Sequence, residues 1–138
     1  MLPGLESRLT AVPLIPGATG SAYGRAGGVP PPWAGVTDPE KAHVAGVWSD
    51  WTASLDELQA LCPNLERVAL VVAWFGTDLR AGECRLRPAV DNREKVTSGA
   101  TWAAAGLTRG SAALVSGHDG RPAFGGTPSD AAVIHAIR

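Results

Sequence analysis

The sequence predicts an α/β fold, and two neighbouring segments carry that prediction. A predicted helix carries an apolar stripe of residues spaced at i, i+4, i+7 and i+11, which are Trp51, Leu55, Leu58 and Cys62. After a short turn, residues 67–76 read RVALVVAWFG, an apolar run without polar alternation that is typical of a strand covered on both faces. A helix, a turn and a doubly buried strand make half of an α/β layered or barrel repeat. A buried hairpin in a β-sandwich is the alternative.

Composition sets the class of protein. The chain has 138 residues, 45% of them hydrophobic and 18% charged, which predicts a single folded domain rather than a disordered chain. The net charge of −1 argues against a nucleic-acid partner. The longest apolar run, residues 68–75, is far shorter than the ~20 residues that cross a bilayer, so we expect no membrane span. Because Glu6 and Arg8 interrupt the early apolar stretch, we expect synthesis in the cytoplasm without export.

The chain divides into a predicted arm and a predicted ordered part. Residues 1–47 are rich in proline and glycine and predict an irregular arm, in which any strand is short and lies at an edge. The GRAGG stretch at 24–28 lacks the Gly-Lys-Ser/Thr of a phosphate-binding loop. Residues 48–138 form the ordered part, whose first helix ends at Cys62 because Pro63 disfavours helical geometry there.

The second half predicts a loop, an inserted hairpin and a last helix. Residues 77–94 are polar and predict a loop. Within an insertion at about 100–125, strands at 112–116 and 121–124 should pair across an Asp-Gly turn at 117–120. Thr127 should cap the last helix, with Pro128 at its first position and Asp130 at its third. The helix reaches Arg138 where an α/β repeat would continue, which predicts a fragment of a longer protein.

Catalytic signatures are missing from the sequence. It contains no G-x-S-x-G elbow, H-E-x-x-H pair, Walker loop or G-x-G-x-x-G after a strand. His43, His118 and His135 have no second histidine at ligand spacing, so we expect no metal and no cofactor.

The candidate site residues lie at the carboxyl end of the predicted buried strand. Trp74, Asp78 and Arg80 are found there, and the loops after strands form the active sites of barrels and open α/β sheets. Asp78 is a weak catalytic candidate, because it has no partner carboxylate in the sequence pattern, and a structural Asp78 to Arg80 ion pair is the favoured interpretation. Trp33, outside any periodic element, is a further candidate for contact with a substrate.

Two long segments resemble a known family. Residues 67–90 read RVALVVAWFGTDLRAGECRLRPAV and residues 124–137 read FGGTPSDAAVIHAI. They resemble the start of the TIM-barrel-like domain of the large baseplate tail protein, the "megatron" or host-specificity protein, of gene transfer agents and related siphophages. The resemblance covers about residues 50–138, and Phe124 stands where that family has tyrosine. It implies an incomplete (β/α) TIM-barrel-like fold, similar to glycoside hydrolases, beginning at residue 48 with a hairpin inserted at about 100–125.

The resemblance also implies a function. We expect a structural or host-surface part of a phage-like tail baseplate that binds cell-wall glycan and is inactive by itself. One alternative is a glycoside hydrolase acting on cell-wall polysaccharide once the barrel is completed, and another is a standalone glycan- or protein-binding module. The expected partners are other tail and baseplate subunits in an oligomeric, virion-like tail particle.

The two cysteines yield a prediction. Cys62 and Cys84 match neither a zinc nor a CxxC redox spacing, and a chain made in the reducing cytoplasm keeps its thiols free. Thiol titration of the freshly isolated, denatured protein should count both groups as free. A disulfide in that material would instead point to export.

Overall fold

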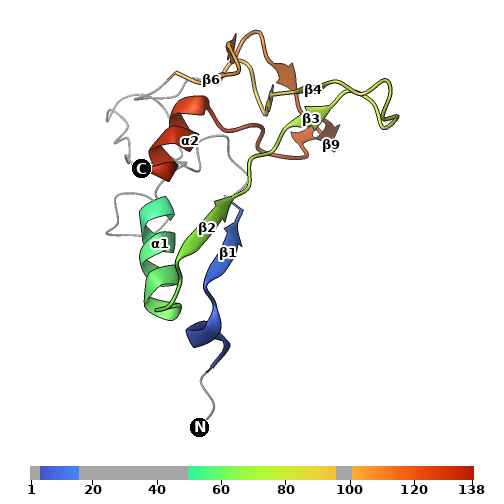
Figure 1. Cartoon of the computed structure of the whole chain (residues 1–138). Helices are drawn as coiled ribbons and strands as arrows, with labels where there is room; N and C mark the ends of the chain where they lie inside the picture. The colour runs from blue at the N-terminus through green and yellow to red at the C-terminus, as the bar shows by residue number, and fades with distance from the viewer. Residues whose placement is uncertain (1–3, 16–49, 96–100) are drawn as a thin grey trace, which may run out of the picture.

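The computed structural model describes residues 4–15, 50–95 and 101–138. Two helices and one 3₁₀ helix accompany ten short strands in these ranges. In chain order they are η1 (Leu5–Arg8), β1 (Ala11–Leu14), α1 (Asp50–Leu61), β2 (Arg67–Leu70), β3 (Phe75–Gly76), β4 (Leu86–Arg87), β5 (Ala89–Val90), β6 (Ala103–Ala104), β7 (Leu107–Thr108), β8 (Ala113–Leu114), β9 (Gly117–His118), β10 (Arg121–Pro122) and α2 (Asp130–Ile137). Figure 1 shows β1, β2 and α1 at one end of the molecule and the short strands at the other.

The predicted first helix is confirmed. α1 ends one residue before Cys62, whose amide still donates to the Leu58 carbonyl at 2.9 Å. Trp51 and Cys62 are buried, as the apolar stripe requires. β1 precedes α1 in the chain and β2 follows it. The two strands pair in parallel, with Ala11 opposite Arg67. β1 lies in the predicted arm and is a short strand, as expected of a proline-containing segment.

The prediction of a doubly buried strand over residues 68–74 is wrong. β2 ends at Leu70, and the side chains of Val68, Val71 and Trp74 are 37%, 41% and 45% exposed. Within the described residues β2 pairs only with β1. A continuous apolar run indicates burial only where neighbouring strands and covering helices exist on both sides. The structure supplies one such neighbour.

The predicted incomplete TIM-barrel-like fold is also wrong. The described strands form separate two-stranded sheets, and these ranges contain no closed barrel and no TIM-like α/β arrangement. A barrel strand must pair with parallel neighbours on both sides, each reached through a crossover. Here the chain leaves β2 and enters the antiparallel hairpin of β3 and β4, in which Phe75 faces Arg87. That turn occupies the stretch of chain in which a barrel would make its next crossover.

The insertion contains two hairpins rather than one. β9 pairs with β10 across Asp119 and Gly120, which have φ values of 48° and 73°, so the predicted Asp-Gly hairpin turn is confirmed. A second turn of the same kind, at Ala105 and Gly106, joins β6 to β7. Of the predicted strand at 112–116, only Ser116 pairs as predicted, since its carbonyl accepts from the Ala123 amide at 2.8 Å; β8 pairs in parallel with β5 instead.

Thr127 joins three segments around the core. The buried cluster consists of Val90, Trp102, Ala104 and Ala112. Thr127 is only 2% exposed, its Oγ1 accepts from the Ala89 amide at 3.1 Å, and its own amide donates to the Ala89 carbonyl at 2.7 Å. Its carbonyl accepts from Trp102 Nε1 at 2.9 Å. Thr127 thereby pairs buried polar groups of β5 and of the core tryptophan.

Gly126 makes the close approach to β5 possible. Its φ of +90° disfavours any residue with a side chain, and a Cβ at this position would lie 2.7 Å from the Ala89 carbonyl oxygen. The residue also forms an antiparallel bridge with Val90. A glycine is therefore required before Thr127.

The prediction that Thr127 caps the last helix is wrong. α2 begins at Asp130, and Ser129 is its N-cap, with Oγ accepting from the Ala132 amide at 3.2 Å. Asp130 accepts from the Ala105 amide at 3.0 Å, so it fixes the β6 to β7 turn rather than closing a capping box. The predicted apolar face of α2 is not buried, since Ile134 and Ile137 are 48% and 71% exposed.

The hydroxyl of Thr127 should be needed for stability. Thr127→Val keeps the shape but leaves the Ala89 amide without its acceptor, and we expect a loss of about 1–3 kcal/mol in the free energy of unfolding. Thr127→Ser keeps the hydroxyl and should cost only about 1 kcal/mol, the value of one buried methyl group. Urea unfolding followed by tryptophan fluorescence measures both. Exposed Thr101→Val is the matched control, and equal losses for the valine and serine variants would contradict the role of the hydroxyl.

Candidate functional site: an arginine-bound carboxylate and an exposed tryptophan

Backbone hydrogen bonds hold the loop between β3 and β4 in one conformation. The Thr77 amide donates to the Arg85 carbonyl at 3.2 Å, and the Arg85 amide donates to Thr77 Oγ1 at 3.0 Å. At its far end, the amides of Glu83 and Cys84 both donate to the Arg80 carbonyl, at 3.0 and 2.9 Å. The loop projects away from the rest of the chain in Figure 1. Its conformation is thus set by its own residues.

Asp78 is bound by Arg80 on both carboxylate oxygens. The Arg80 amide and Nε donate to Oδ1 at 2.8 and 3.0 Å, and Nη2 donates to Oδ2 at 2.7 Å. The guanidinium and backbone hydrogen bonds from Arg80 hold the pKa of Asp78 below its usual value. Asp78 is therefore ionised at neutral pH, and its charge is already compensated, which does not suit a general acid.

Of the other predicted contact residues, Trp74 is exposed and Trp33 lies outside the described residues. Trp74 precedes β3 and is 45% exposed, so its indole face is accessible. Trp33 and His43 lie outside the described residues. Sequence reasoning missed Leu79, which stands between the two paired residues and is fully exposed. Only an unusual position for leucine in a polar loop could have indicated it.

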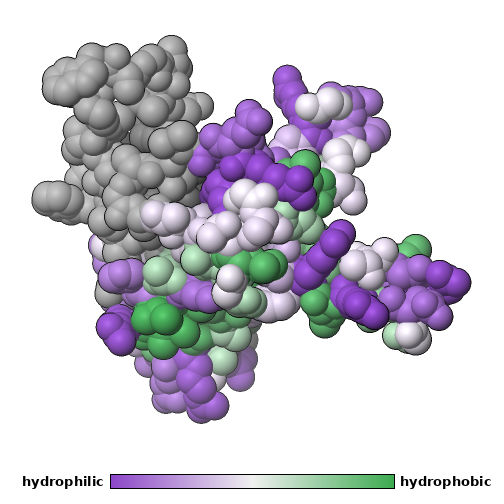
Figure 2. Space-filling model, turned by 90° about the horizontal axis from the view of Figure 1, so that it is seen from above, coloured by the Kyte–Doolittle hydropathy of each residue, from purple (hydrophilic) through white to green (hydrophobic). Residues whose placement is uncertain are grey.

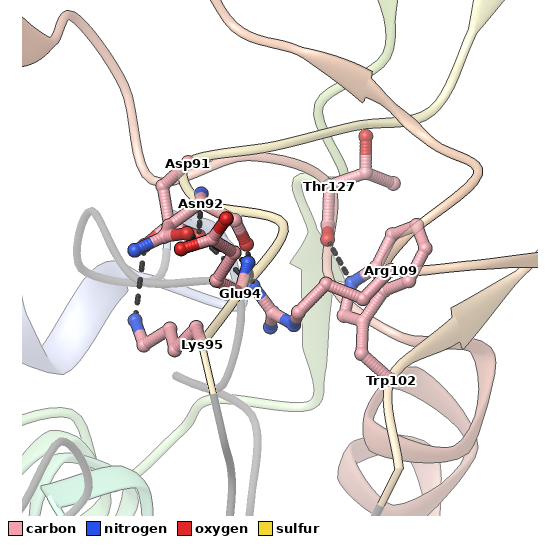
Figure 3. A network of polar contacts seen from close by, with 7 residues as sticks. All are labelled: Asp91, Asn92, Glu94, Lys95, Trp102, Arg109 and Thr127. Carbon is pink, nitrogen blue, oxygen red and sulfur yellow. Dashed lines mark hydrogen bonds and ion pairs between the residues drawn. The ribbon is translucent and has the colours of Figure 1, made fainter.

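A second polar cluster, shown in Figure 3, was not predicted. Arg109 is 8% exposed and donates through Nη1 to Asp91 Oδ1 at 3.0 Å and to the Asn92 carbonyl at 2.9 Å. Lys95 Nζ lies 2.9 Å from Asp91 Oδ2. The Arg109 guanidinium also lies 5.8 Å from the centroid of Trp102, a cation–π contact. The cluster ties the segment after β5 to the turn after β7.

Asp91 is kept ionised by its partners. Burial alone raises the pKa of Asp91, but the hydrogen bond and charge of Lys95, the Asn92 amide and Arg109 together outweigh it, so the pKa lies below its ordinary value. Because the side chains of Asp91, Lys95 and Arg109 are only 16%, 22% and 10% exposed, we assign this cluster a structural role. The spacing of Asp91 and Lys95 is visible in the sequence, whereas Arg109 is brought in only by the hairpin.

The described residues contain no group of three or more His, Cys, Asp or Glu side chains able to hold a metal ion. His118 and His135 are both exposed. No described helix has the length and apolar character required to cross a membrane. Cys62 and Cys84 are both free, as the sequence predicts. Among the described residues, the arrangement thus offers an exposed aromatic side chain and an ion pair with a fixed geometry.

Comparison with known proteins gives no family assignment, since no family model, curated protein or solved structure matches the chain.

The Asp91 cluster should make stability depend on acid pH. A carboxylate whose folded-state pKa is lowered contributes its full stabilisation above the unfolded value of about 3.9, and loses it as pH falls through the lower folded-state pKa. Asp91→Asn should cost about 2 kcal/mol at pH 7, and its difference from wild type should shrink below about pH 4. Urea unfolding at pH 7, 5 and 3 checks this. Asp119→Asn, exposed on a turn, is the control, and a difference independent of pH would rule the ion pair out as its source.

Proposed function

We propose that this chain is a non-catalytic, contact-making part of a phage-like tail baseplate that binds cell-wall glycan through Trp74 and the loop between β3 and β4. The observation that carries the proposal is the state of Asp78. Its two oxygens are held by Arg80, and its pKa is lowered, so the carboxylate at this site is a fixed structural charge. A glycosidase needs a second carboxylate and a proton donor at this place.

Two exposed side chains, Trp74 and Arg80, support binding. Trp74 presents a flat apolar ring with an N–H donor, which suits stacking against a sugar face. The Arg80 side chain is 74% exposed even while paired, so part of its guanidinium faces solvent. The hydrogen-bonded loop keeps Arg80 in position before a ligand arrives, which lowers the entropic cost of binding.

The sequence resemblance over residues 50–138 supports the setting of a tail baseplate. The resemblance rests on two long segments, and the first of them contains Trp74, Asp78 and Arg80. The structure removes the barrel from this argument, so a hydrolase completed by further barrel strands has no structural support. Binding requires only the surface that the described residues already present.

Co-sedimentation of the whole chain with insoluble peptidoglycan tests the proposal. Trp74→Ala should weaken binding about tenfold, because it removes the exposed stacking face; tenfold corresponds to about 1.4 kcal/mol. Ile134→Ala, at a similarly exposed apolar position on α2, is the matched control and should bind as wild type.

Release of soluble glycan from the same samples separates binding from catalysis. The proposal expects no release by wild type. Release that Asp78→Asn abolishes would contradict it and favour an enzyme, and wild-type protein that stays in the supernatant would contradict glycan binding itself.

A further inference from the structure

We propose that the loop between β3 and β4 docks onto the exposed face of α1 in a second copy of this chain, so that copies associate head to tail. The loop surface is defined as Leu79, Arg85 and Arg87, and the helix surface as Asp56, Glu57 and Leu61. All six residues are exposed. The proposal does not depend on glycan binding by Trp74.

The loop surface is basic with an apolar tip. Residues 75–87 contain three arginines and two carboxylates, and one of those carboxylates, Asp78, is neutralised by Arg80. Arg85 and Arg87 are two residues apart in extended chain, so they project from the same face. Leu79 is wholly exposed although the loop around it is held by hydrogen bonds, which places a fixed apolar side chain in water. Such a side chain gains free energy only when another surface covers it.

The helix surface is complementary in both respects. α1 contains acidic residues and no basic ones, and its last turn lacks the cation that would favour the negative end of the helix dipole. Glu57 and Leu61 are one helical turn apart and so lie on one face. Leu61 is 56% exposed at that end. A basic and apolar partner would satisfy the charge and cover the leucine together.

One molecule cannot close this contact on itself. Figure 1 shows α1 at the opposite end of the molecule from the projecting loop. Seen from above in Figure 2, apolar surface emerges in separate patches between hydrophilic regions rather than as one continuous face. Each copy therefore offers one loop surface and one helix surface at different places. A contact of this heterologous kind builds a ring or an open chain, not a two-fold dimer.

Sedimentation velocity over a concentration series around 100 μM tests self-association, since a small contact is expected to be weak (Kd about 100 μM). Wild type should associate, and raising the salt should weaken association because exposed charges are screened. The double variants Arg85→Glu with Arg87→Glu and Asp56→Lys with Glu57→Lys should each weaken association at least about tenfold. Leu79→Asp should do the same without touching the arginines.

Mixing the two charge-reversed variants gives the decisive result. The acidic loop of the first then meets the basic helix of the second, and the remaining wild-type surfaces also match, so the mixture should associate although neither variant does alone. Circular dichroism checks that each variant is folded. Arg121→Glu, an exposed charge on β10, is the control and should associate as wild type.

Three outcomes would overturn the proposal. They are wild type that stays monomeric throughout the series, association unchanged by both charge reversals, and folded variants whose mixture stays monomeric. Because peptidoglycan co-sedimentation reports on Trp74 separately, a failure here is distinguishable from a failure of glycan binding.

Discussion

The fold of the described residues depends on one buried threonine. Thr127 binds both backbone groups of Ala89, and its carbonyl accepts from the Trp102 indole. It therefore connects β5, the core tryptophan and the segment before α2 by hydrogen bonds. Two-stranded sheets whose strands are only two residues long, such as β5–β8 and β6–β7, have little stability of their own. The polar groups buried between them must be paired for the core to form. Thr127 pairs the polar groups of Ala89 and Trp102 that are buried beside the small apolar cluster of Val90, Trp102, Ala104 and Ala112.

The Arg109 cluster continues this arrangement on the other side of Trp102. The guanidinium lies near the indole and reaches Asp91, and Asp91 in turn binds Lys95. The charge of this nearly buried arginine is compensated by the Asp91 carboxylate, and the Asn92 carbonyl also accepts from its Nη1. Residues 89–95, the β6–β7 hairpin and the start of α2 are therefore tied together by hydrogen bonds and ion pairs.

The exposed surfaces follow from the same shortage of core. In the part of the chain that the structure describes, β2 has one strand partner, and its apolar continuation ends at an exposed Trp74. The loop beyond it is stabilised locally by Arg80, so it holds its shape without being buried. Leu79 on the loop, Leu61 on α1 and Ile137 on α2 all face solvent. A chain with so many exposed apolar side chains presents surfaces suited to covering by a ligand or partner.

Local signals in the sequence determined the local structure, and the tertiary structure decided the rest. The stripe from Trp51 to Cys62, the proline after it and the Asp119-Gly120 turn fixed α1 and the β9 to β10 hairpin, because spacing and backbone preference act within a few residues. The sequence also identified the Asp78 and Arg80 pair, which are two residues apart. It could not determine the neighbours of β2, the parallel pairing of β5 with β8 or the role of Thr127. Those features depend on residues that are tens of positions away in the sequence. The sequence of an apolar run or around a threonine is the same whether or not distant residues cover it, so it does not indicate burial.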